Sequence, residues 1–145
     1  MALWTAETGE LVTRWKADAT ITAAVGATTA ARIYRGNARQ GVPLPYIVYL
    51  VAGGQVEVAH AGPANLAHAI LHIYVYGVTA DQANVLAEYI AADLRSVAKG
   101  RLITAGTWID NIECSIPDDA EDPPINAADE WKYWARIVAT VHYVT

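Results

Sequence analysis

Histidine and cysteine are the side chains in this 145-residue sequence best suited to metal binding or nucleophilic chemistry, and they are few. His68 and His72 have the i, i+4 spacing that places two metal ligands on one face of a helix. Within residues 69–78, however, aliphatic side chains alternate with histidine and tyrosine, which is typical of a strand. Four strand positions span roughly 13 Å, so one ion could not bridge the two imidazoles. We expect no metal site here.

Cys114 is the only cysteine, so the sequence predicts neither an internal disulfide nor a multi-cysteine metal site. A cysteine nucleophile needs a nearby base, and strand pairing could bring His142 beside it. This leaves open one alternative function, a small cytoplasmic enzyme or ligand-binding domain with a pocket near Cys114 and His142. A lone cysteine in an apolar strand is more often a small core residue.

An acidic segment, residues 117–130, contains six carboxylates and three prolines. It lacks the alternating Asp/Asn ladder, central glycine and terminal glutamate of a calcium-binding loop. A segment of this composition cannot be buried, so we expect a projecting acidic loop. Its first cluster consists of Asp118, Asp119, Glu121 and Asp122.

Charge is distributed unevenly along the chain. Residues 1–50 carry a net charge of +2 and residues 51–145 a net charge of -7, which gives -5 in total. The basic cluster of the first third consists of Arg32, Arg35 and Arg39. No aromatic platform is interleaved with it, and no glycine-rich loop leads into a helix with Lys-Ser/Thr. The sequence therefore predicts no nucleic-acid site and no cofactor, and the cluster is typical of a solvated or subunit-contacting loop.

The helical elements are read from caps and apolar spacing. We expect a short helix over residues 3–14 and a second that Asp18 caps and Gly26 ends. The strongest pattern predicts a helix over residues 80–98, capped by Thr79. Its apolar stripe consists of Ala83, Leu86, Ala87, Ile90, Ala91, Leu94 and Val97.

Strands are predicted on both sides of that helix. Residues 46–51 are almost continuously apolar, which favours a strand covered on both faces. Pro43 and Pro45 stiffen the chain just before it, and their missing N–H groups place them at an edge or before pairing begins. We expect Gly53 and Gly54 to break this strand. Residues 108–116 and 134–144 alternate as two further strands.

The order of these elements predicts an α+β fold. We expect one domain over residues 1–145, with a largely antiparallel sheet of about four to five strands and helices packed mainly on one face. Hydrophobic residues make up 54% of the chain and charged ones 17%, so other subunits are expected to cover part of the surface. No apolar run reaches the roughly 20 residues of a membrane span, and we expect no membrane contact.

Several sequence features follow one another in an order that resembles a known family. They are Arg32-Ile-Tyr, then Pro-Leu-Pro-Tyr-Ile-Val-Tyr, then Gly62-Pro63, then the alternating strand that ends near Tyr76, and then Thr-Ala-Asp-Gln-Ala-Asn-Val-Leu-Ala-Glu at the start of a helix. The pattern is similar to the tail-completion proteins of long-tailed bacteriophages, also called tail terminators or head-to-tail joining proteins. The resemblance covers about residues 10–145.

The resemblance implies a structural virion protein and no enzyme. Such proteins assemble in the host cytoplasm as a ring, typically a hexamer, at the head-proximal end of the tail tube. The ring ends growth of the tube and presents a surface to the neck or connector protein, while DNA passes through without specific binding. The family has no catalytic motif, so no functional residue is carried over. Residues 117–130 depart from the family pattern because they are longer and more acidic.

Two groups of residues are candidates for roles in such a ring. Closure joins unlike patches, so the basic cluster Arg32, Arg35 and Arg39 is our candidate for one side of the subunit interface. For Asp118, Asp119, Glu121 and Asp122 two roles remain open. They line the channel or its rim, where carboxylates keep DNA from sticking, or they form a docking arm against the connector or tube.

Overall fold

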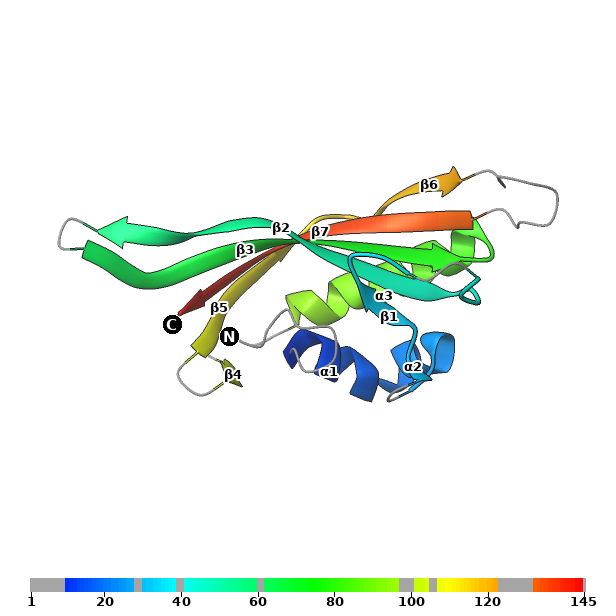
Figure 1. Ribbon diagram of the computed structural model, residues 1–145, viewed down its shortest axis with the longest axis horizontal. Coiled ribbons are helices and arrows are strands. Elements are labelled where there is room, and N and C mark those ends of the chain that lie inside the picture. Colours follow the sequence, from blue (N-terminus) through cyan, green and yellow to red (C-terminus); the bar gives the residue numbers. More distant parts are fainter. Residues whose placement is uncertain are drawn as a thin grey trace.

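The computed structural model describes residues 10–27, 30–38, 41–59, 62–96, 101–104, 107–122 and 132–144 (Figure 1). Within these residues, three helices and seven strands follow one another. They are α1 (Glu10–Ala17), α2 (Ala19–Val25), β1 (Ile33–Arg35), β2 (Tyr46–Ala59), β3 (Gly62–Gly77), α3 (Ala80–Arg95), β4 (Arg101–Thr104), β5 (Thr107–Cys114), β6 (Asp118–Asp122) and β7 (Lys132–Val144). Of the first helix, expected over residues 3–14, residues 3–9 lie outside the described residues, and α1 continues to Ala17.

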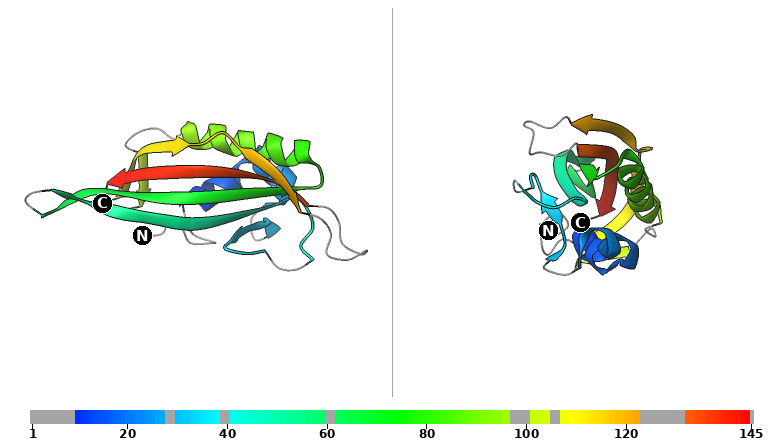
Figure 2. Two further views of the ribbon diagram at one scale, coloured as in Figure 1. Left: turned by 90° about the horizontal axis from the view of Figure 1, so that it is seen from above. Right: turned by 90° about the vertical axis from the view of Figure 1, so that its right-hand side faces the viewer.

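The strands form one twisted sheet in the order β1-β2-β3-β7-β5-β4, and β6 pairs with β7 beside β5. Every pairing is antiparallel except that of β1 with β2. The three helices lie on one face of this sheet (Figure 2). The α+β class, the largely antiparallel sheet and the one-sided helical layer are thus confirmed. Within the described residues the sheet has seven strands where we expected four to five, because the short strands β4 and β6 were not expected.

The hairpin of β2 and β3 is longer than the sequence indicates. We expected Gly53 and Gly54 to break the strand, but β2 continues through them to Ala59. The pairing register shifts once between Val51 and Gly53 instead. A bulge at that point bends the strand without ending it, since glycine tolerates the local backbone change. The far end of the hairpin extends beyond the helical layer (Figure 1).

Alternation in the central strands divides the sheet into a core face and an open face. On β3 the buried side chains are Ala69, Leu71, Ile73 and Val75. On β7 they are Ala135, Ile137, Ala139 and Val141. The stripe of α3 packs onto this face through Ala83, Leu86, Ala87, Ile90, Ala91 and Leu94, each less than 6% exposed. The six positions are those predicted for the helix, and Val97 lies outside the described residues.

The junction between β3 and α3 is tight. Thr79 caps the helix, as predicted, because its hydroxyl accepts a hydrogen bond from the Gln82 amide at 3.1 Å. The Gln82 side chain reaches back and accepts one from the Val78 amide at 2.8 Å. A Cβ at Gly77 would lie 2.9 Å from the Ala83 amide nitrogen, so only glycine lets the strand approach the first helical turn this closely.

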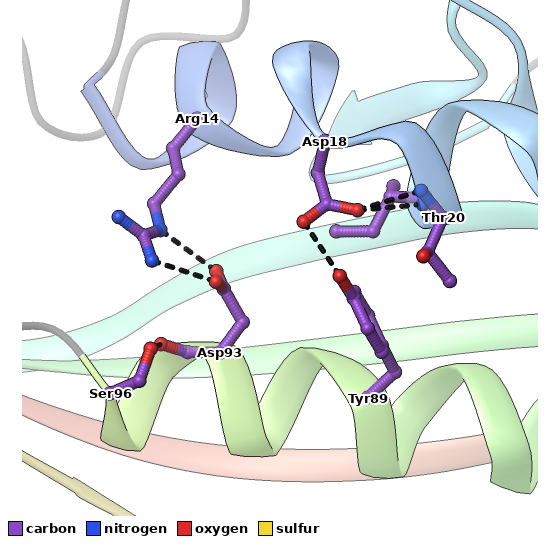
Figure 3. Close-up of polar contacts among 7 residues, drawn as sticks. Arg14, Asp18, Thr20, Tyr89, Asp93 and Ser96 are labelled. Atoms are coloured by element: carbon purple, nitrogen blue, oxygen red, sulfur yellow. Dashed lines mark hydrogen bonds and ion pairs between the residues drawn. The ribbon is translucent and has the colours of Figure 1, made fainter.

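Two polar contacts hold α1 and α2 against α3 (Figure 3). Arg14 donates two hydrogen bonds to the carboxylate of Asp93, at 2.9 and 2.8 Å. Asp18 caps α2 through the amides of Thr20 and Ile21, as predicted, and its second oxygen accepts a hydrogen bond from the Tyr89 hydroxyl at 2.8 Å. These charge-assisted bonds fix the two short helices against adjacent turns in the C-terminal half of α3.

Candidate interaction surface

One half of the sheet has two open edges of unlike composition. In this half the strands lie in the order β1-β2-β3-β7-β6. The register aligns one residue from each strand in a row: Tyr34, Val48, Tyr74, Arg136 and Asp118. Within the described residues, β1 pairs only with β2 and β6 only with β7. An unpaired strand edge presents backbone N–H and C=O groups to a partner.

The first edge, which we call the basic edge, is β1 with the flanking Arg32. Arg32 is not free to meet a partner, because its guanidinium donates to the carbonyl oxygens of Pro45 at 2.9 Å and Ala24 at 3.1 Å. It therefore anchors β1 between α2 and the start of β2. Arg35 is exposed at the end of the strand. Burial raises the pKa of Tyr49 to about 12, and the nearby charge of Arg35 opposes that rise.

Of the predicted basic cluster, the structure thus gives Arg32 an internal role and leaves Arg35 at the surface. Arg39 lies outside the described residues. Pro45 directly precedes β2, so its missing N–H removes no ladder bond, as the sequence indicates. Pairing begins at the next residues, where the Ile47 amide donates to the Arg32 carbonyl at 2.9 Å.

The second edge, which we call the acidic edge, is β6. We expected residues 118–122 to lie in a projecting loop, but they pair with β7 from Asp118 opposite Arg136 to Asp122 opposite Lys132. An edge strand tolerates carboxylates because one side of the strand stays in water. Arg136 also offsets one of the charges, as its guanidinium binds Asp118 at 2.9 Å. The rest of the predicted loop, residues 123–131, lies outside the described residues.

The ion pair at the acidic edge is exposed, with 38% of the Arg136 side chain and 60% of the Asp118 side chain accessible. Hydrogen bonding to Asp118 and the charge of that carboxylate raise the pKa of the Arg136 guanidinium. The backbone register places Asp119 opposite Ala135 and Glu121 opposite Tyr133. The four acidic residues named from the sequence are therefore brought together on one strand, and they are not brought near the basic cluster of the same chain.

The open face between the two edges carries aromatic side chains. Tyr46 and Tyr76 stack with their rings 4.7 Å apart, and Tyr74 and Trp134 make an edge contact at 5.6 Å. All three helices lie on the other face of the sheet (Figure 2). Alternation in residues 72–76 indicated this second face, but the sequence could not show which face the helices would cover.

The alternative catalytic site is contradicted by the pairing of β5 with β7. Cys114 lies opposite Ala139 and packs against the core, whereas His142 lies opposite His68 on the open face. The thiol and the imidazole are therefore on opposite faces of the sheet. Burial raises the pKa of the Cys114 thiol, partly offset by the charge of Arg95, which is the wrong direction for a nucleophile. The two side chains therefore cannot line one pocket.

The histidines considered as metal ligands, His68 and His72, are not arranged as a metal site either. His68 and His72 lie on the same strand, as expected, and His68 faces His142 with the ring centres 5.8 Å apart. His142 is 3.8 Å from the Glu113 carboxylate. Among the described residues no group of three histidine, cysteine or acidic side chains is arranged to hold an ion.

Comparison with known proteins identifies the family. The family model described as "Tail completion protein gp17" matches residues 9–114, which is well over half of the chain. The chain belongs to this family. Membership confirms the resemblance drawn from the sequence and makes the protein a structural component of a phage-type tail. The match ends at Cys114, so the acidic edge lies beyond the matched range.

A solved structure shows the same fold as this tail-completion family member. A chain of the "Virion of native gene transfer agent (GTA) particle" superposes with a TM-score of 0.56 and 18% sequence identity, and the alignment covers 91% of each chain. No curated protein shows a significant sequence match. Within the described residues, no helix is long and apolar enough to cross a membrane.

Proposed function

We propose that the protein forms a closed ring of six copies at the head-proximal end of a phage-type tail tube. The ring ends growth of the tube and joins the tail to a neck or connector protein, and DNA passes through its centre. Assembly takes place in the host cytoplasm before the tail joins the head. Family membership supports a place in the tail, and the two unlike edges of the sheet support a ring.

A ring requires that each subunit offer two different surfaces, one to each neighbour. The basic edge with Arg35 and the acidic edge β6 are such a pair, since they lie at opposite sides of the same half-sheet. We propose Arg35 and Arg39 as contact residues, and Arg32 as the residue that holds β1 in place for them. An isologous dimer would join like edges, which carry charges of the same sign.

Passage of DNA requires that the protein bind phosphate weakly. Each phosphate neutralised by lysine or arginine releases counterions and strengthens binding, so free cations on a channel wall would slow translocation. Four described arginines bind partners within the chain. They are Arg14 with Asp93, Arg32 with two carbonyls, Arg95 with the carbonyls of Cys114 and Ser115, and Arg136 with Asp118. With a net charge of -5, the subunit has little cationic surface to offer DNA.

Two roles were expected for the acidic segment, lining of the channel and docking against the connector or tube. For residues 118–122 we propose instead a contact with the neighbouring subunit. The observation behind this choice is that residues 118–122 form an edge strand, which is a surface for pairing. Binding of Asp118 to Arg136 also lowers the net charge that this segment would present to a channel.

The observation that carries the proposal is family membership, because it places the protein in the tail before any detail of assembly is considered. The test is polymerisation of the tail-tube protein of the same phage with and without this protein. We expect short tubes with a ring of extra density at one end when it is present. Unchanged tube lengths and bare tube ends at equimolar protein would contradict the proposal.

A matched control uses Glu88→Lys, which reverses an exposed charge on α3, away from both sheet edges. This variant should cap tubes as well as the unmodified protein does. If Glu88→Lys did not cap tubes, net charge and not a particular surface would be responsible for capping.

A further inference from the structure

The directions of the strands fix how two copies of this sheet can join. β1 runs parallel to β2, β3 runs opposite to β2, β7 runs opposite to β3, and β6 runs opposite to β7. The two edge strands of this half-sheet therefore point in opposite directions. If a second copy continues the sheet in the same orientation, its β1 lies antiparallel to β6 of the first copy. Antiparallel ladders are the more stable kind per residue.

The backbone of β1 has groups that face outward. In a parallel pair, alternate residues bond to the neighbouring strand. The Arg32 carbonyl accepts from Ile47 at 2.9 Å and the Gly36 amide donates to Tyr49 at 2.8 Å, so these even positions face β2. The backbone groups of Ile33 and Arg35 consequently point away from β2. Among the described residues β1 pairs with no strand on that side, so these groups can bond to a strand that lies along the outer side of β1.

Charge selects which edges can meet. Four of the five residues of β6 are acidic, whereas β1 is flanked by Arg32 and ends in Arg35. Two copies of β6 would repel each other, as would two copies of β1, so the isologous pairings are disfavoured. Only β6 against β1 joins opposite charges. The same arrangement prevents uncontrolled pairing with other strands, because a charged edge is a poor template for an apolar one.

We propose that β6 of one subunit pairs antiparallel with β1 of the next, so that the sheet runs on from subunit to subunit around the ring. The occupant of the acidic edge is thus a second copy of this chain. All helical layers then lie on the same side of the extended sheet, since the copies keep one orientation. This inference rests on the proposed ring and adds to it the surfaces and the strand direction of each contact.

The test uses two oppositely altered proteins that restore each other. Arg35→Glu puts an acidic side chain at the exposed end of β1, so that both edges are acidic there. The triple variant Asp119→Lys, Glu121→Lys and Asp122→Lys leaves one carboxylate and three lysines on β6, so that both edges are basic. Each alone should lose rings by at least about tenfold, because like charges then meet at every contact. A 1:1 mixture should restore rings in which the two variants alternate. Native mass spectrometry would read three copies of each in a six-membered ring.

Two further measurements show whether the backbone takes part and whether the variants are folded. Amide hydrogen exchange of β1 and β6 should slow in the ring relative to either variant alone, while exchange in α3 should not change. Unfolding midpoints of the variants should stay close to that of the unmodified protein, because Arg35 is exposed.

The outcomes separate this inference from the proposed ring. If the unmodified protein forms rings and both variants do so as well, with β1 and β6 exchanging as in the monomer, the edge pairing is wrong and the ring stands. Variants that keep their rings but lose binding to tail tubes would assign the edges to the tube and also overturn the pairing. An unmodified protein that stays monomeric both alone and with tubes contradicts the ring itself.

Discussion

Arg136 of β7 donates to Asp118 of β6 with a closest distance of 2.9 Å, and this contact joins the acidic edge to the strand that runs through the middle of the sheet. The two residues are directly opposite each other in the register. Without the arginine, a strand with four carboxylates in five residues would have less to hold it against β7. The contact thus keeps a poor strand-forming sequence extended and in place for pairing.

We predict that Asp118→Asn loosens β6 locally and leaves global stability almost unchanged. The pair is exposed, and exposed pairs contribute little to the free energy of unfolding. Amide exchange in residues 118–122 should become faster, while the thermal midpoint should shift by less than that of a core variant. Glu113→Gln on the neighbouring strand is the control, and it should leave β6 unchanged. Equal exchange in both variants would show that the ion pair does not hold the strand.

We predict that Asp93→Ala destabilises the fold by about 1.5–3 kcal/mol, the range for hydrogen bonds to charged groups. Asp93 accepts two bonds from Arg14 across the interface of α1 with α3, and its side chain is only 12% exposed. Urea unfolding measures the change. The control Glu88→Ala removes an exposed carboxylate from the same helix and should cost less than about 0.5 kcal/mol. Equal losses of stability in the two variants would mean that the contact of Arg14 with Asp93 contributes nothing beyond an exposed carboxylate.

Asp18 should make stability depend on acid pH. Burial alone would raise the pKa of this carboxylate, but hydrogen bonds from the Ile21 amide, the Tyr89 hydroxyl and the Thr20 amide, with the charge of Arg14, hold it below its usual value of 3.8. A lowered pKa gives stability that is present above the unfolded pKa and is lost as the pH falls through the folded one. The loss therefore lies below about pH 4.

The matched variant for this prediction is Asp18→Asn, which keeps a helix-capping side chain and removes the titrating group. Thermal unfolding between pH 7 and pH 3 should give a shallower decline for the variant than for the unmodified protein. Parallel declines in the two proteins would show that Asp18 has no part in acid unfolding.

Cys114 should react slowly with iodoacetamide in the folded protein. Burial raises the pKa of its thiol, so little thiolate is present near neutral pH. We expect alkylation at pH 7.5 to be at least about tenfold slower than in urea-unfolded protein. Mass spectrometry measures the rate directly. Faster alkylation of the folded chain than of the unfolded chain would restore the thiol as a candidate nucleophile.

Some elements of the fold are encoded by neighbouring residues in the sequence, and others depend on strands that are distant in the sequence. The helix at residues 80–95 could be predicted because its cap at Thr79 and its apolar stripe are encoded within one segment. Strand β6 could not, since Asp118–Asp122 has low strand propensity and is held by pairing with β7, which follows it in the sequence. The continuation of β2 past Gly53 was missed for the same reason, because β3 supplies the partner.

The candidate surface could be predicted only in part. The unequal charge of the two parts of the chain pointed to unlike surfaces, and the structure places Arg35 and the acidic residues at opposite edges of one half-sheet. The internal role of Arg32 depends on carbonyls of Ala24 and Pro45, whose positions no local pattern encodes. Likewise, the separation of Cys114 from His142 follows from the register of β5 with β7.

The ring is tested most directly by electron microscopy of the unmodified protein, alone and after mixing with tail tubes. We predict closed particles with sixfold rotational averages, and the same particles at one end of each tube. Monomers in solution, together with tubes that carry no added density at either end, would contradict the proposed ring.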